Sequence, residues 1–230
     1  MTRRRVNNPL ALAVLACLVE RPMHPYEIST TLRTRGKERS IKLNYGSLYS
    51  VVGALEKHGL ISARETVREG RRPERTVYAV TDAGRAEFED WLAELLSTPT
   101  TEPSSLEAAL SLAAGLPPDE VARLLQQRCQ RLEIEVAGLQ AGVDLSREQG
   151  LPDLFLVETL FSIAMLRAEL DFVRALAADI RRGTFPGVDL WRQIHALLES
   201  GKTLDELAPV IAAGLGDDAR FLALDAREPE

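Results

Sequence analysis

Hydrophobic positions between residues 44 and 80 follow a helical pattern first and a strand pattern afterwards. In the range 44–58 the apolar residues recur at intervals of three and four and form one stripe, which consists of Leu48, Val51, Val52 and Leu55. The segment 61–67 then alternates loosely, and a second strand is expected over 77–80, with Tyr78 on the face opposite to Ala79. The pattern predicts a helix followed by a β-hairpin.

The face of this predicted helix opposite the apolar stripe carries small side chains. At about 100° per residue it presents Gly46, Ser50, Gly53 and Lys57. A glycine in a helix interior costs roughly 1 kcal/mol relative to alanine, so another requirement must favour these residues. Close approach to the DNA major groove is one such requirement, because small side chains let the backbone come near phosphates and base edges. The alternative is a buried helix packed closely against a neighbour.

The segment between the two predicted strands is rich in arginine. Four arginines fall within the eight residues from Arg68 to Arg75, and at a hairpin tip they can contact backbone phosphates. Glu69 and Glu74 dilute this charge, so an ordinary charged loop is the alternative. Together with the preceding helix, the pattern is typical of a winged helix-turn-helix that binds DNA.

The first 35 residues allow two interpretations. Three arginines followed by the apolar run 10–19 resemble a signal peptide, but Glu20-Arg21-Pro22 follows directly and no small-residue cleavage site precedes it. Pro9 favours a helix start instead, and ten apolar residues are too few to span a bilayer. We therefore expect a helix over 10–19, another over 26–35, and a cytoplasmic protein without a membrane segment. The triple arginine is either a basic arm that contacts DNA or a frayed tail.

The net charge of −6 is distributed unevenly along the chain. Residues 1–85 hold 16 Lys and Arg against 8 Asp and Glu, a net charge of +8, and the remaining residues carry −14. A basic part joined to an acidic part fits a DNA-reading unit followed by a unit that stays away from phosphates. The overall acidity therefore does not exclude nucleic-acid binding.

A segment rich in Pro, Ser and Thr, 97–105, separates the basic part from a helical remainder. We place the boundary there, which predicts a winged helix-turn-helix domain over 1–98 and a helical dimerisation domain over 99–230. In the second domain, a long helix beginning near Pro117 carries a heptad-like seam formed by Leu125, Cys129, Leu132, Val136, Leu139 and Val143. This spacing suits packing against another long helix or against a dimer partner.

The predicted helix 153–182 is apolar almost all round in its first half. This composition predicts burial on more than one side, as in a helix that contacts both its own subunit and a partner. A two-fold dimer would match symmetric DNA half-sites, whereas a large monomeric bundle core is the alternative. Farther on, after a short helix over 189–199, Pro209 lies inside the last helical pattern and is expected to kink or shorten it.

Three segments read as motifs in a fixed order. They are Tyr26-Glu27-Ile28, then Gly46-Ser47-Leu48-Tyr49 with Leu55-Glu56-Lys57-His58-Gly59-Leu60-Ile61, and finally Val77-Tyr78-Ala79-Val80-Thr81-Asp82-Ala83-Gly84-Arg85. In residues, order and spacing, the range 10–96 resembles the PadR-type transcriptional regulators. It departs from them at Ser50, where proline is frequent, and at Val52, where leucine is usual, so no base preference is transferred. The resemblance implies a homodimeric repressor whose helical C-terminal region dimerises and often helps to form a ligand site.

We expect DNA contacts from the following residues: Tyr26, Lys42, Asn44, Tyr45, Gly46, Ser47, Tyr49, Ser50, Arg71, Arg72 and Arg75. In this hypothesis 44–50 enters the major groove of a palindromic double-stranded operator, and the wing arginines reach flanking phosphates or the minor groove. For a small hydrophobic or aromatic effector, the candidate contacts are Phe155, Phe161, Met165, Phe172 and Trp191. Aromatic residues at helical spacing belong more often to a core, which is the alternative for each of these five.

No sequence pattern indicates catalysis. The chain has no Walker loop, nucleophile elbow, dinucleotide fingerprint or spaced metal ligands, and its two cysteines and three histidines lie in separate elements. We therefore expect no enzyme activity, no cofactor and no metal. The expected fold class is mainly α with a small β-hairpin wing. The alternative function is a helical protein-interaction module without DNA binding, which would not need the wing arginines.

Overall fold

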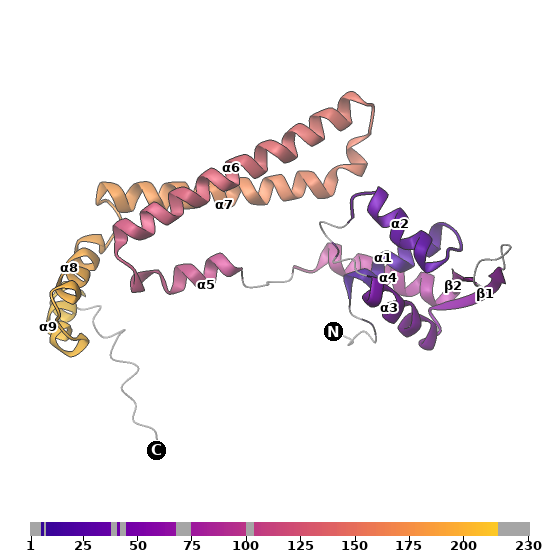
Figure 1. Ribbon diagram of the computed structural model, residues 1–230, viewed down its shortest axis with the longest axis horizontal. Helices are drawn as coiled ribbons and strands as arrows, with labels where there is room; N and C mark the ends of the chain where they lie inside the picture. Colours follow the sequence, from indigo (N-terminus) through magenta and orange to yellow (C-terminus); the bar gives the residue numbers. More distant parts are fainter. Residues whose placement is uncertain are drawn as a thin grey trace, which may run out of the picture. The chain divides into compact units, whose positions relative to one another are not determined.

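The computed structural model describes residues 6, 8–37, 41, 45–67, 75–99 and 104–215, and the chain divides into two compact units, Met1–Glu102 and Pro103–Glu230 (Figure 1). Within these ranges the first unit contains helices α1 to α4 and one β-hairpin, and the second contains helices only. The fold is mainly helical with a small two-stranded antiparallel sheet, as the sequence predicts. None of the described helices has both the length and the apolar character that crossing a membrane requires.

The first two helices begin at capping residues. At the start of α1 (Pro9–Glu20), the side chain of Asn8 accepts a hydrogen bond of 2.9 Å from the backbone N–H of Leu10. At the start of α2 (Pro25–Thr34), the ring of His24 accepts a bond of 3.0 Å from the N–H of Tyr26, and the carboxylate of Glu27 accepts one of 2.9 Å from the N–H of His24. Both helices start at a proline, which leaves no N–H to satisfy there.

Helix α3 (Tyr45–Lys57) packs its predicted apolar stripe into the core of the first unit. Leu48 and Leu55 are completely buried and Val52 is nearly so, alongside the apolar residues of α1. The helix gives way to Gly59, whose φ of +71° is the left-handed conformation that glycine adopts readily. The stripe predicted from spacing is confirmed.

The hairpin consists of β1 (Ile61–Val67) and β2 (Arg75–Val80), which pair antiparallel from Ile61 opposite Val80 to Val67 opposite Arg75. The register shifts between Ala63 and Glu65. At the other edge of β2, the backbone groups of Met23 and Tyr78 exchange two hydrogen bonds of 3.0 Å. Tyr78 and Val80 contact the core, so the base of the hairpin is held on both sides.

The start of α4 (Asp82–Ser97) is held tightly against the end of α3. Thr81 caps α4: its hydroxyl oxygen accepts a 3.0 Å bond from the N–H of Gly84 and lies 2.7 Å from the carbonyl oxygen of Gly59. The Thr81 N–H also donates to the carbonyl of Leu60 at 3.0 Å. Gly84 is buried, and a Cβ at this position would lie only 1.9 Å from the Leu60 carbonyl oxygen. Only glycine therefore permits this approach.

An ion pair ties the end of α1 to the end of α2. Arg35 donates to both carboxylate oxygens of Glu20, at 2.5 and 2.7 Å. The hydrogen bond from Arg35 holds the pKa of Glu20 below its ordinary value. Both side chains are about half exposed, so solvent screens the pair and its contribution is small.

The second unit is built around a helical hairpin. A short α5 (Ser105–Ser111), capped by Ser104 and Glu107, leads through the 3-10 turn η1 (Ala113–Gly115) to α6 (Pro118–Glu148). After the turn η2 (Asp153–Phe155), α7 (Val157–Arg182) returns alongside α6 (Figure 1). The predicted seam on α6 is confirmed, since five of its residues are buried and Val136 is partly buried against the same cluster. Arg128–Glu169 and Arg174–Glu133, both at 2.6 Å, bridge the two helices.

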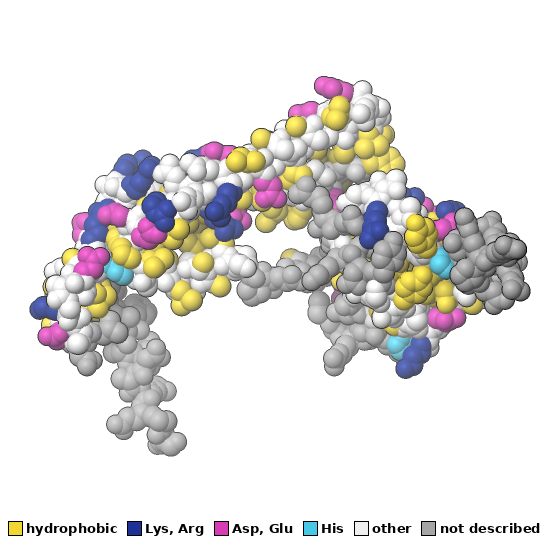
Figure 2. Space-filling model, in the orientation of Figure 1, with side chains coloured by type: hydrophobic (Ala, Val, Ile, Leu, Met, Phe, Trp, Pro, Cys, Tyr) yellow, Lys and Arg dark blue, Asp and Glu magenta, His cyan; other side chains and the backbone are white. Residues whose placement is uncertain are grey.

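The predicted burial of α7 on more than one side stays a prediction, because the single chain covers only one of its faces. Buried residues on one face, such as Ile163 and Val173, pack against α6, but an apolar stripe on η2 and α7 remains exposed. This stripe consists of Leu154, Phe155, Val157, Phe161 and Met165. Figure 2 shows yellow hydrophobic side chains at the surface near the end of the hairpin where α6 turns into α7. One packing partner can cover only one face of a helix.

The last described helices are α8 (Val188–Glu199) and α9 (Leu204–Leu215). Helix α9 continues for six residues beyond Pro209, so this proline does not end it, and the expected kink stays a prediction. Leu207 is completely buried, and a Cβ on Gly214 would collide with the side chain of Leu190, so α9 packs closely against α8. Residues 216–230 lie outside the described residues.

The junction between Leu60 and Gly84 generates a stability prediction. Gly84→Ala should destabilise the first unit by about 2–3 kcal/mol, because the new methyl group meets a backbone carbonyl that cannot move without breaking the cap of α4. The matched control is Gly53→Ala in α3, where a Cβ has nothing within 4 Å, so stability should rise by about 1 kcal/mol. Urea unfolding followed by circular dichroism measures both. Equal stability of Gly84→Ala and wild type would contradict the described contact.

The Glu20–Arg35 pair generates a pH prediction. Because the folded-state pKa of Glu20 is lowered, its stabilisation is present above the unfolded-state pKa and disappears as the pH falls through the folded-state value. Glu20→Gln should therefore lower the free energy of unfolding at pH 7 by less than about 1 kcal/mol, and the difference should shrink in acid and vanish below the folded-state pKa of Glu20. Glu89→Gln, at an exposed carboxylate of α4, serves as the control and should change little. A deficit of Glu20→Gln that persists in acid would show that the pair acts through packing instead.

Candidate nucleic-acid interface and effector cavities

The exposed face of α3 combines small groups with one tyrosine and one lysine. Because the apolar stripe is buried, the residues at the opposite helical positions face solvent: Gly46, Tyr49, Ser50, Gly53 and Lys57. Nothing lies within 4 Å of the place where a Cβ on Gly53 would stand, so the backbone of α3 is open to an approaching surface. This is the shape that the sequence predicts for a helix that enters a DNA groove closely.

Two tyrosines extend from this region into solvent. Tyr49 on α3 and Tyr26 on α2 are each 53% exposed, which leaves their hydroxyl groups accessible to a phosphate oxygen. Ser50 differs, since its hydroxyl donates a 2.9 Å bond to the carbonyl of Gly46 one turn earlier. Its hydrogen is thus used within α3, and only its lone pairs face outward. Ser47 is half-buried.

Several of the expected DNA contacts cannot be placed. Lys42, Asn44, Arg71 and Arg72 lie outside the described residues. Tyr45 is the first residue of α3, and Arg75 is the first residue of β2, where it pairs with Val67. The side chains of Tyr45 and Arg75 are also outside the described part of the structure. The expected contacts at these positions stay predictions.

Two further charged residues bear on where DNA could bind: Arg64 on the hairpin and Glu56 on α3. Arg64 is exposed and lies where the register of the hairpin shifts, so it stands out of the regular pairing. The sequence analysis overlooked it because it lies within the strand and not at the arginine-rich tip. At the other end, Glu56 lies beside Tyr78, and burial first, then this carboxylate, raises the pKa of Tyr78. A carboxylate repels phosphate, so Glu56 limits the surface that can face DNA.

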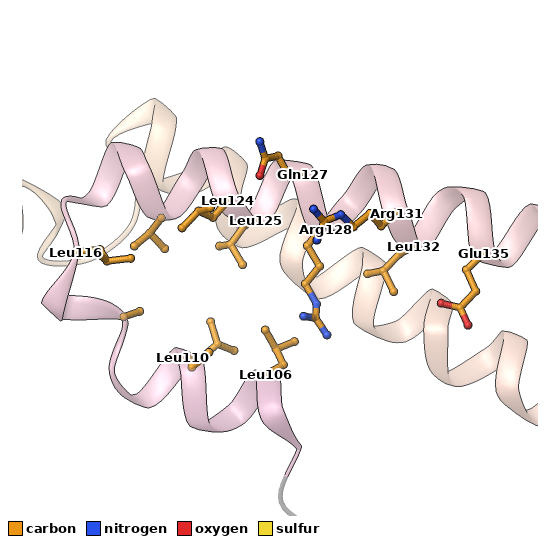
Figure 3. A pocket seen from close by; sticks show the side chains of 13 residues that line it. Leu106, Leu110, Leu116, Leu124, Leu125, Gln127, Arg128, Arg131, Leu132 and Glu135 are labelled. Carbon is orange, nitrogen blue, oxygen red and sulfur yellow. The ribbon is translucent and has the colours of Figure 1, made fainter. Parts of the chain in front are cut away.

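The second unit contains a leucine-lined cavity between α5 and α6, which we name the α5–α6 cavity (Figure 3). Its volume is about 420 Å³. Leu106 and Leu110 on α5 face Leu125 and Leu132 on α6, and Arg128 reaches from α6 into the space between the helices. Charged groups therefore border this cavity.

A different cavity of about 350 Å³, the α8 cavity, lies among η1, α7 and α8. Phe172, Phe185 and Trp191 contribute three aromatic rings to its wall. Leu110 and Ala113 line both cavities, so the α5–η1 segment forms a wall between them.

The structure brings together only part of the expected effector site. Phe172 and Trp191 line the α8 cavity, as the sequence analysis expects of an apolar pocket in these helices. Phe155, Phe161 and Met165 belong to the exposed stripe of η2 and α7 and line neither cavity. Within the described ranges, no three His, Cys, Asp or Glu side chains stand close enough together to hold a metal ion.

Residues 14–90 match the sequence model of the transcriptional regulator PadR-like family. The chain is 33% identical over 89 residues to a probable transcriptional regulator of Mycobacterium tuberculosis, a match that covers 37% of this chain and 44% of that protein. It is 24% identical over 136 residues to the negative transcriptional regulator PadR of Bacillus subtilis, which covers 59% of this chain and 73% of that protein. The crystal structure of Bacillus subtilis PadR in complex with operator DNA matches with a TM-score of 0.59 at 19% identity, over 74% of this chain and 98% of that one.

These similarities concern different parts of the chain. The match spans less than half the length of the mycobacterial relative, and the similarity to the solved structure shows the fold alone. The family match extends from α1 into α4 and includes the three sequence motifs, which lie on α2, on α3 with the start of β1, and on β2 with the start of α4. This N-terminal unit therefore contains a domain of the transcriptional regulator PadR-like family, over residues 14–90.

Proposed function

We propose that this protein is a cytoplasmic, DNA-binding transcriptional regulator that acts as a homodimeric repressor. The observation that carries the proposal is the exposed small-residue face of α3, because it belongs to a unit of a transcriptional regulator family. The positive charge of residues 1–85 supports it, since phosphate contacts require cations. The named similarity to the negative regulator of Bacillus subtilis supports repression over activation.

In this proposal α3 enters the major groove with its glycine face toward the bases. Gly46 and Gly53 let the backbone approach, and the hydroxyls of Tyr26 and Tyr49 bind phosphate oxygens on either side. Arg64 and the arginines of the hairpin tip bind flanking phosphates. Phosphate contacts set position and affinity, and the open face of α3 is left for base contacts.

The exposed apolar stripe of η2 and α7 supports a homodimer. Soluble monomers seldom expose a continuous row of large apolar side chains, and such rows mark interaction sites. A two-fold partner that covers the stripe would also place two copies of α3 on a palindromic operator. Burial of α7 on a second side, which the sequence predicts, would then be achieved by the partner.

Effector control is the last part of the proposal. A small hydrophobic or aromatic molecule in a cavity of the second unit would release DNA if it binds one arrangement of the dimer better than another. The alternative function, a helical interaction module without DNA binding, has no use for the exposed glycine face or for the tyrosines beside it. No cofactor enters this proposal.

Selection from random duplex DNA at several salt concentrations tests DNA binding and the dimer together. We expect a palindrome with half-sites about one helical turn apart and an affinity that falls steeply with salt. The double variant Arg71→Ala, Arg72→Ala should lower the slope of log affinity against log salt by about two, because two phosphate contacts are lost. If no sequence is retained at low salt by protein free of small molecules, the proposal fails and the interaction module replaces it.

A pair of tyrosine variants tests the orientation of α3. Tyr49→Phe should weaken operator binding about tenfold, because a hydrogen bond to a charged phosphate is lost. Tyr78→Phe removes a hydroxyl that faces Glu56 inside the unit and should leave operator affinity within about twofold. Fluorescence anisotropy with the selected duplex measures both. An equal loss for the two variants would indicate a general effect on folding and contradict the assigned role of Tyr49.

A further inference from the structure

The wall of the α8 cavity offers no charge and no free hydrogen-bonding group from its side chains. The side chains that line it are all apolar, and they include Leu110, Ala114, Phe172, Leu176, Phe185 and Trp191. The one polar side-chain atom among them, the indole nitrogen of Trp191, already donates a 2.9 Å bond to the carbonyl of Leu116. A molecule in this cavity is therefore recognised by shape and by contact with aromatic rings.

Hydrogen bonds at the edges of the cavity hold its walls in place. Besides the Trp191 bond, the His195 ring nitrogen lies 2.9 Å from the carbonyl oxygen of Ala114 in η1. Arg192 donates a 2.9 Å bond to the carbonyl of Ile180 near the end of α7 and lies 3.2 Å from Asp119 on α6. Helix α8 is thus fastened to η1, α6 and α7 at once. The cavity exists before any ligand arrives, so little ordering cost opposes binding.

The two cavities of this unit differ in the chemistry they offer. The α5–α6 cavity is bordered by Arg128 and Arg131 and also by Glu135, so a charged ligand group there would meet charged side chains, although Arg128 is also paired with Glu169. The α8 cavity has no charged side chain in its wall. An ionised ligand group placed against this wall would lose hydration without gaining a charged partner from the side chains that line it. Its volume of about 350 Å³ lies within the usual range for small-molecule sites.

We propose that the α8 cavity is a binding site for a small, uncharged aromatic molecule, and that this molecule is the effector. The first half of the statement stands on the cavity alone, whereas the second rests on the proposed function. A pocket with an apolar wall suits an apolar ligand, which buries its own surface against that wall. Three rings, from Phe172, Phe185 and Trp191, can stack on a planar ligand or contact it edge to face.

The position of the cavity lets a bound ligand influence the arrangement of the α5–η1 segment. The α5–η1 segment forms one wall, and α5 begins at Ser105, next to the boundary between the two units. A ligand that fills the cavity binds only the arrangement of α5–η1 that keeps it open, and so it shifts the equilibrium toward that arrangement. DNA affinity changes to the extent that the other arrangement binds the operator differently.

Calorimetric titration of the full chain with two matched probes tests the site. The probes are 1-naphthol, which is uncharged at pH 7, and 1-naphthoate, which has the same ring with a carboxylate. We expect one 1-naphthol per chain and at least about tenfold weaker binding of 1-naphthoate, because its charge has no partner. Tighter binding of 1-naphthoate, or no binding of 1-naphthol, overturns the proposed ligand class.

Variants then locate the site. Ala114→Phe fills the α8 cavity while keeping the backbone carbonyl that His195 contacts, and it should weaken 1-naphthol binding at least about tenfold. Phe172→Ala, at an exposed position, removes one aromatic ring from the wall and should also weaken 1-naphthol binding. Leu124 lines only the α5–α6 cavity, so Leu124→Ala serves as the control and should change 1-naphthol affinity by less than about twofold. A loss in Leu124→Ala without one in Ala114→Phe would place the ligand in the α5–α6 cavity and contradict the proposal.

A separate measurement keeps the two proposals distinct. Operator binding by the protein without any probe tests the proposed function, and probe binding without DNA tests the cavity. If 1-naphthol binds as described but operator affinity is the same with and without it, the cavity is a site and its effector role is wrong. If the protein binds no DNA at all, the proposed function fails while the binding result stands.

Discussion

Burial of one side of α3 is the constraint on which the proposed DNA-facing surface depends. Leu48, Val52 and Leu55 are almost completely removed from solvent, and burial of each such side chain contributes about 1.5–3 kcal/mol. The two glycines on the opposite side cost only about 1 kcal/mol each. Packing therefore outweighs helix propensity, and α3 can present a small, open face without losing its helical structure. The same packing determines the rotation of α3, and hence which residues can meet a DNA groove.

The hairpin and α4 are attached to α3 through backbone contacts around Leu60. The carbonyl of Leu60 accepts a bond from Thr81 and touches the Cα region of Gly84, while the Thr81 hydroxyl lies against the carbonyl of Gly59. Few side chains take part, so the junction depends on backbone geometry that only small or capping residues allow. The end of α3, the base of the hairpin and the start of α4 are consequently joined by one set of backbone contacts.

In the second unit, the long helices α6 and α7 carry more apolar surface than they can bury against each other. The seam of α6 packs against one face of α7, and the ion pairs at Arg128 and Arg174 set their register from the outside. What remains is the exposed stripe on one side and two cavities beside α5–η1. The exposed stripe is the surface that the proposed homodimer would cover. The two cavities are the places where the proposed effector could bind, and they differ in the charge of the side chains that border them.

Local signals in the sequence were sufficient for most of the first unit. The spacing of the α3 stripe, the prolines that start α1 and α2, and the glycine after α3 all act within a few residues, and they predicted the elements correctly. The three motifs also identified the family that the match over 14–90 confirms. The same local reasoning found the seam of α6, because helical spacing shows which residues share a face.

Spacing does not show what a face meets, and this was decided by the tertiary structure. Helix α9 continues through Pro209 and packs against α8, where Gly214 lies close to Leu190. Phe172 and Trp191 share a cavity, whereas Phe161 lies on an exposed stripe, although all three look alike as aromatic residues in helices. The sequence by itself determined the helices, the hairpin and the family, because these depend on short-range periodicity, caps and motifs. Only the packing of α5–η1, α7 and α8 created the α8 cavity, because a cavity depends on how distant segments meet.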